Sequence, residues 1–216
     1  MNDLRLREAV REELDYEPSL DASDIGVMAS GGVVTLSGHV ASYAQKIAAE
    51  QATWRVDGVQ AIAQGIEVHL PGETKLSDDE VARRALNTLA WDVLVPSEKL
   101  HLKVVDGWIT LSGEVAWHYQ REAAEAAVRK LAGLTGVSNH ILVQPHAEPG
   151  NVHKLIADAL KRHAEVEADQ IEVDVQPNGT VAIEGHVGGW KARRAVERAA
   201  WSAPGVRAVD NRVRIA

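Results

Sequence analysis

One segment recurs three times in this chain of 216 residues, and it limits the possible folds more than any other feature. It reads GVVTLSGHV at 32–40, GWITLSGEV at 107–115 and GTVAIEGHV at 179–187. The second glycine of each copy is followed by another glycine 20 positions later, at Gly58, Gly133 and Gly205. A repeat at constant spacing predicts three copies of one small structural unit.

The first half of each copy is predicted to form a helix and a β-hairpin. Apolar residues at helical spacing predict the helix: Leu6, Val10 and Leu14; Val81, Ala82, Ala85, Leu86 and Leu89; Val152, Ile156 and Leu160. Alternating apolar residues then predict a strand that begins at Ile25, Leu100 and Ile171. Asp106-Gly107 and Asn178-Gly179 are typical of tight hairpin turns, and the return strand ends at the repeated glycine.

The second half of each copy is predicted to form a helix and a third strand. Small apolar residues occupy one face of the helix, and Gly58, Gly133 and Gly205 suit its C-terminal end. Because the helix acts as a crossover, the third strand should run parallel to the second. We therefore predict an α+β fold with three tandem α-β-β-α-β two-layer sandwiches at 1–70, 76–144 and 150–216, each a three-stranded mixed sheet with two helices on one face.

Net charge and composition exclude several classes of function. The chain carries a net charge of −8, which argues against general nucleic-acid binding. Residues 1–70 hold 5 basic and 11 acidic groups, whereas residues 150–216 hold 10 basic and 9 acidic groups. Only the third module therefore lacks the acidic balance that disfavours an anionic membrane. The absence of cysteine excludes disulfides and thiolate metal sites.

The repeat resembles the BON domain family, named for bacterial osmotic-shock and nodulation proteins. The resemblance is carried by Leu36-Ser37-Gly38-His39-Val40 and its counterparts, by Gly58-Val59 and Gly205-Val206, and by Val209-Asp210-Asn211. The second copy matches with Gly133-Leu134 and Val137-Ser138-Asn139, whereas the first departs with Ile62-Ala63-Gln64. The resemblance covers nearly the whole chain. It implies a non-enzymatic, stress-related module that binds phospholipid or supports components of the cell envelope.

A search for reactive constellations predicts neither an enzyme nor a metal or cofactor site. The chain contains no nucleophile elbow, Walker loop or dinucleotide fingerprint. His39 and His186 share one module position, but the second copy has Glu114 there. We interpret these histidines as surface or loop residues; a shared metal site of His39, Glu114 and His186 is the less favoured alternative.

The second helix of each module supplies the candidate binding residues. Trp54, Arg129 and Trp201 share one position, nearly opposite the apolar face, and are expected to point away from their own module's core. Two explanations stay open: packing between modules, or contact with a membrane interface or partner. The candidate residues for lipid or partner binding are Trp190, Lys191, Arg193, Arg194, Arg198, Trp201, Arg207, Trp54 and Trp117.

These features predict a non-enzymatic binding or scaffold protein, with anionic phospholipid or another protein as partner and no nucleic acid. The alternative is a purely structural assembly module in which Trp54 and Trp201 are buried between modules. The N-terminus becomes charged at once, without the apolar segment of a signal peptide, so we expect a cytoplasmic rather than a periplasmic protein. The oligomeric state is left open by the sequence.

Overall fold

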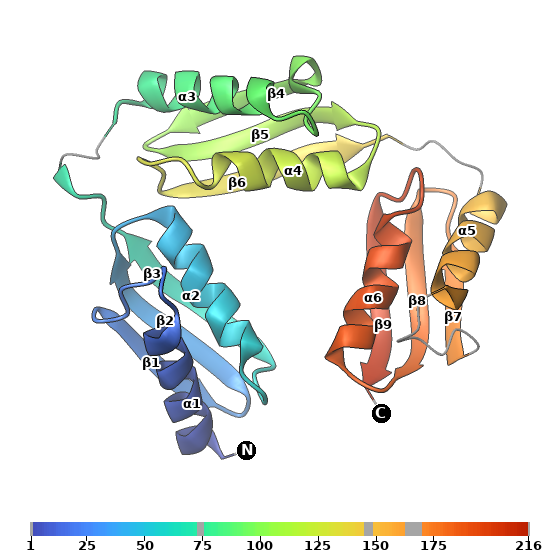
Figure 1. Cartoon of the computed structure of the whole chain (residues 1–216), viewed down its shortest axis with the longest axis horizontal. Helices are drawn as coiled ribbons and strands as arrows, with labels where there is room; N and C mark the ends of the chain where they lie inside the picture. The colour runs from blue at the N-terminus through green and yellow to red at the C-terminus, as the bar shows by residue number, and fades with distance from the viewer. Residues whose placement is uncertain (1, 73–75, 145–148, 163–169, 216) are drawn as a thin grey trace. The chain divides into compact units, whose positions relative to one another are not determined.

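A computed structural model describes residues 2–72, 76–144, 149–162 and 170–215, and within them the predicted α+β fold is confirmed (Figure 1). Much of the two segments between modules lies outside these ranges. The first module consists of α1 (Asp3–Tyr16), β1 (Ile25–Ser30), β2 (Val33–Val40), α2 (Tyr43–Arg55) and β3 (Ala61–Val68). Two of its helices are capped by side chains: Asn2 accepts the Arg5 amide (2.9 Å), and Ser42 accepts the Gln45 amide (3.3 Å).

The second and third modules repeat this order of elements. The second contains α3 (Asp78–Trp91), a short 3₁₀ turn (Ser97–Lys99), β4 (Leu100–Val105), β5 (Trp108–Val115), α4 (His118–Val128) and β6 (Gly136–Val143). The third contains α5 (Pro149–Lys161), β7 (Ile171–Val175), β8 (Thr180–Val187), α6 (Trp190–Trp201) and β9 (Ala208–Ile215). By its contacts the chain divides into two compact units, Met1–Thr88 with Leu102–Thr110 and Ala127–Ser138, and Leu89–His101 with Leu111–Ala126 and Asn139–Ala216.

Each module has its own three-stranded sheet, in the orders β1-β2-β3, β4-β5-β6 and β7-β8-β9. In the first and third modules the outer pairs are antiparallel and parallel, as predicted: β1 and β7 run against the central strand, and β3 and β9 run along it. The register is equivalent in the two modules, since Leu36 lies between Val27 and Gln64 and Ile183 lies between Val173 and Asn211.

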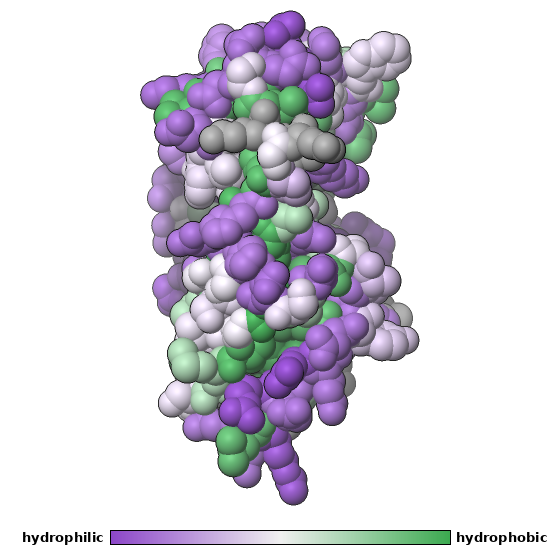
Figure 2. Space-filling model, turned by 90° about the vertical axis from the view of Figure 1, so that its left-hand side faces the viewer, coloured by the Kyte–Doolittle hydropathy of each residue, from purple (hydrophilic) through white to green (hydrophobic). Residues whose placement is uncertain are grey.

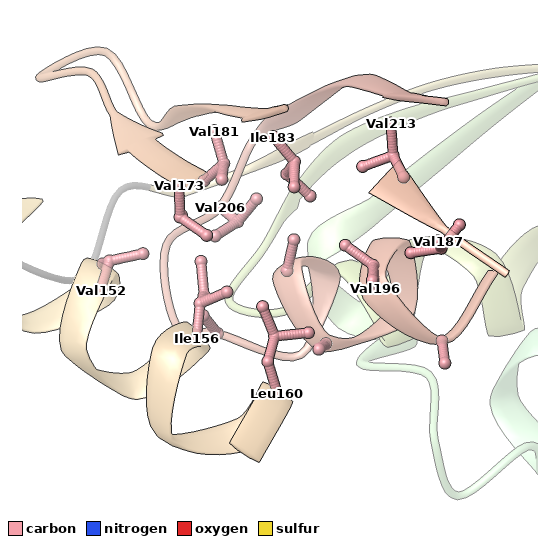
Figure 3. Close-up of a cluster of buried hydrophobic side chains, with 14 of the residues drawn as sticks. Val152, Ile156, Leu160, Val173, Val181, Ile183, Val187, Val196, Val206 and Val213 are labelled. Atoms are coloured by element: carbon pink, nitrogen blue, oxygen red, sulfur yellow. The ribbon is translucent and has the colours of Figure 1, made fainter. Parts of the chain in front are cut away.

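The core of each module lies between its helices and one face of its sheet. In the third module, Val152, Ile156 and Leu160 from α5 meet Val196 from α6 and the inward side chains of β7, β8 and β9 (Figure 3). The predicted apolar positions of the first helices are buried, except that in α3 Ala82 is partly buried and Leu86 is exposed. Leu86 lies one position beyond Ala85, and the 100° step of the helix carries it out of the core.

The repeated glycine is required by a close approach of two backbone segments. Gly38, Gly113 and Gly185 have φ values of +107°, +127° and +140°. A Cβ atom at these positions would run into the backbone carbonyl oxygen of Asp24, Lys99 and Gln170, respectively. Glycine alone combines this conformation with the missing side chain. The recurrence of the segment therefore has a structural cause.

A polar clasp joins the second helix to the last strand in two of the modules. Asn211 donates to the Glu197 carboxylate (3.2 Å) and accepts the Val213 amide (3.2 Å). Asn139 likewise donates to Glu125 (3.1 Å) and accepts the Ile141 amide (3.1 Å).

The first module lacks half of this clasp because Gln64 stands in place of asparagine. Its oxygen still accepts the Ile66 amide (3.2 Å). Among the described residues, however, the buried Gln64 Nε2 has no hydrogen-bond partner. Glu50 occupies the position that corresponds to Glu197.

Gln64→Asn is therefore expected to stabilise the first module by about 1–2 kcal/mol. The shorter amide would donate to Glu50 and remove a buried, unsatisfied donor. Urea unfolding at equilibrium measures the change. The reverse substitution Asn211→Gln is the matched control and should destabilise the third module by a similar amount. Gln64→Asn that leaves the free energy of unfolding unchanged would contradict this account.

Candidate functional site

Exposed apolar residues do not single out one surface of this protein. They occur in all three modules, and the face seen in Figure 2 shows several apolar patches among polar side chains. Scattered exposed apolar residues are normal in folded proteins. The candidate residues differ instead in their individual environments.

Helix α6 buries one face and presents a basic stripe on another. Its buried residues are small: Ala192, Ala195, Val196, Ala199 and Ala200. Lys191, Arg194 and Arg198 are exposed, and their spacing of three and four residues places them on one side of the helix. We call these three residues the basic stripe.

The basic stripe belongs to the third module alone. At the corresponding positions the second helices of the other modules carry no basic residue; they carry Ala44, Ile47 and Gln51 in α2, and Tyr119, Glu122 and Ala126 in α4. The single acidic residue of α6, Glu197, accepts the Asn211 amide in the clasp. The stripe is thus a difference between modules that share a framework.

Arg193, another candidate residue, lies against its own sheet and outside the stripe. Its guanidinium donates to the Val213 carbonyl (3.1 Å) and to the Asn211 carbonyl (3.1 Å), both on β9. The same guanidinium lies 5.4 Å from the centre of the Trp190 ring. This is the geometry of a cation–π contact. It steadies Trp190, which remains 60% exposed at the start of α6.

Trp201 is partly buried, which corrects the expectation that it points away from its own module's core. It packs against the hydrophobic core of the third module. Its ring also stacks on His118 of the second module, with centroids 3.6 Å apart and planes inclined by 13°. His118 and Trp201 belong to the same compact unit of the chain. The helix period predicted an outward Trp201, and it carried no information about the core contact or about the neighbouring His118 ring.

Burial lowers the pKa of His118 below its ordinary value. Glu122 and Glu197 oppose this shift by attracting the imidazolium, whereas Arg121 adds to it. The Nε2 atom lies 3.4 Å from the Glu122 carboxylate, and the side chain is only 12% exposed. Within the described residues the buried Nδ1 atom has no hydrogen-bond partner. A neutral ring is therefore favoured in the stack.

The remaining candidates lie in separate places. Trp54, at the α2 position that corresponds to Trp201, is 43% exposed, so it is not buried as the assembly alternative expected. Trp117 is exposed just before α4 and donates its backbone amide to Gln120 (3.1 Å). Arg207 is exposed, and its aliphatic stem lies close to Gly179. The structure thus gathers only part of the candidate set on α6.

The three residues of the less favoured metal hypothesis have different partners. His39 lies 3.4 Å from the Asp24 carboxylate and stacks on His69 at 4.8 Å. Glu114 accepts the Gln144 amide (2.8 Å), and His186 is exposed. In the described ranges, no group of three or more metal-ligating side chains is placed to hold an ion. No helix in those ranges combines the length and apolar character needed to cross a bilayer.

Sequence reasoning missed His118, although a signal for it was present. His118 is the first residue of α4, just as Tyr43 begins α2 and Trp190 begins α6. All three lie five residues after the repeated glycine. Aligning the helix starts would have shown a ring at this position in every module.

Comparison with known proteins agrees with this architecture. The family model for the BON domain matches residues 2–69, 77–145 and 151–216. Osmotically-inducible protein Y of Escherichia coli (strain K12) is 28% identical over 145 residues, which are 65% of this chain and 72% of that protein. Two structures of CdsD, a structural protein of the type III secretion system of Chlamydia trachomatis, are each 16% identical. The first covers 100% of both chains with a TM-score of 0.26, and the second covers 98% of this chain and 92% of its own with a TM-score of 0.27. At TM-scores this low, nothing about this chain follows from either structure.

Proposed function

Because the chain belongs to the BON domain family, we propose that it is a non-enzymatic, stress-related protein whose third module binds anionic phospholipid surfaces. The stress-related context is supported by its similarity to osmotically-inducible protein Y. The observation that carries the lipid proposal is the basic stripe of Lys191, Arg194 and Arg198, exposed on one side of α6.

Charge favours the third module over the other two for this contact. Residues 150–216 carry 10 basic and 9 acidic groups, whereas residues 1–70 carry 5 and 11. Each lysine or arginine near an anionic surface contributes about 1 kcal/mol, and salt screens this attraction. Three such side chains on one helix face are enough for weak, salt-sensitive association, in which the third module would contact the lipid headgroups.

The test is co-sedimentation with vesicles of mixed phosphatidylglycerol and phosphatidylcholine. The full chain should bind these vesicles at low salt and dissociate from them at high salt. It should not bind vesicles of phosphatidylcholine alone. The triple variant K191Q/R194Q/R198Q should lower the affinity by about 100-fold, because it removes about 3 kcal/mol of attraction.

A matched variant controls for overall charge. R5Q/R7Q/R11Q removes three exposed basic residues from α1, so its net charge equals that of the stripe variant. It should bind vesicles like the unchanged chain. Equal loss of binding in both variants, or no binding by the unchanged chain, would refute the proposal.

A further inference from the structure

The stack of His118 on Trp201 joins two positions that every module has, when residues are counted from its repeated glycine. We call this pairing of positions the contact rule. His118 lies five residues after the repeated glycine of its module, and Trp201 lies sixteen residues after that of the next. Their ring centroids are 3.6 Å apart. Glu197, twelve residues after the same glycine, is close enough to raise the pKa of His118 against the effect of burial. The start of one second helix thus meets the end of the following one.

Two aromatic residues have no partner under the contact rule, one in the first module and one in the third. Five residues after the repeated glycine stand Tyr43, His118 and Trp190. Sixteen residues after it stand Trp54, Arg129 and Trp201. In chain order the rule assigns Tyr43 to Arg129 and His118 to Trp201. Among the three matched modules at 2–69, 77–145 and 151–216, the rule gives no partner to Trp190 or to Trp54. These two rings are 60% and 43% exposed.

We infer that the chain associates head to tail with further copies of itself, with Trp190 of one copy stacked on Trp54 of the next. The contact would continue the stacking that His118 and Trp201 already make within one chain. A contact between two different patches of the same molecule is heterologous, so it produces rings or open chains of copies. The partner of each exposed tryptophan is therefore a second copy of this protein.

Charge is complementary between the two surfaces. Lys191, Arg193 and Arg194 lie within four residues of Trp190 on α6, and the Arg193 guanidinium lies 5.4 Å from the centre of the Trp190 ring. Near Trp54 the acidic residues are Glu50, which corresponds to Glu197, and Asp57. Arg55 beside Trp54 is paired with Glu13 (2.6 Å) and Glu17 (2.8 Å), so its charge is largely compensated. Contact through Trp190 would thus place positive charge from α6 against the acidic first module of the next copy.

Sedimentation velocity on the full chain tests this inference. As its concentration rises, the unchanged protein should sediment with an apparent mass greater than the 23.4 kDa of one chain. Trp54→Ala and Trp190→Ala should each weaken association by about tenfold or more, because buried tryptophans dominate such contacts. Trp91→Ala is the matched control, since Trp91 is 86% exposed but lies outside both positions, and it should associate like the unchanged chain.

The decisive sample is an equimolar mixture of the Trp54→Ala and Trp190→Ala proteins. Each variant keeps one intact end, so the mixture should form a dimer that does not grow, although neither variant associates well alone. A symmetric contact between like surfaces would not give this result. The inference is overturned if the unchanged protein keeps the mass of one chain up to about 1 mM, if either variant assembles normally, or if the mixture fails to dimerise. Trp54→Ala and Trp190→Ala leave all three residues of the basic stripe in place, so either variant can lose self-association while vesicle binding is retained.

Discussion

Gly38→Ala is expected to destabilise the first module by more than about 3 kcal/mol. Gly38 has a φ of +107°, and an added Cβ would strike the backbone carbonyl of Asp24. The left-handed conformation alone costs an alanine about 1–2 kcal/mol, and the backbone must then shift to relieve the collision. A module of about 70 residues has only about 4–10 kcal/mol of stability in total, so this loss is a large part of it.

Gly31→Ala is the matched control in the same module. Gly31 also has a positive φ, +58°, but nothing lies within 4 Å of an added Cβ. Gly31→Ala should therefore cost about 1–2 kcal/mol, which is the conformational cost alone. Urea unfolding gives both free energies, and hydrogen exchange of peptides from residues 1–70 localises the loss to the first module. Equal costs for the two substitutions would show that the approach of Asp24 to Gly38 does not matter.

Trp201→Ala is expected to lower the stability of the third module by about 2–3 kcal/mol. Trp201 packs against the core of that module and stacks on His118, so truncation removes both apolar burial and a ring contact. Thermal and urea unfolding measure the loss. Dilute protein should be used, so that association between chains does not contribute to the measured stability.

Trp54→Ala provides the comparison, because Trp54 holds the same module position but is 43% exposed. Its truncation should cost less than about 1 kcal/mol under the same conditions. A loss as large as that of Trp201→Ala would mean that Trp54 is buried in solution. The pair of variants therefore separates a tryptophan that stabilises the folded chain from one that is available to a partner.

The order and pairing of the elements could be predicted because they depend on local patterns. Apolar spacing identified the helices, alternation identified the strands, and the Asp106-Gly107 and Asn178-Gly179 turns identified hairpins. The recurrence of the glycine is visible in the sequence, but the physical reason for it is not. Its collision partner, such as Asp24 for Gly38, becomes visible only when the hairpin is closed.

The candidate site was only partly predictable, because side-chain direction does not determine what a side chain meets. Trp54 and Trp201 share a helix position but differ in their surroundings. Arg193 was grouped with the exposed cations, yet it donates to two carbonyls of β9. Contacts of this kind join residues far apart in the chain, and periodicity carries no information about them.

The alanine face of α6 has a thermodynamic consequence for such a small module. Four of its five buried residues are alanines, at 192, 195, 199 and 200. Alanine has no rotamers to lose, whereas ordering a larger side chain costs up to about 2 kcal/mol of conformational entropy. The helix therefore approaches the sheet closely while freezing few degrees of freedom. A module with a limited core can in this way stay folded by keeping the entropic cost of folding low.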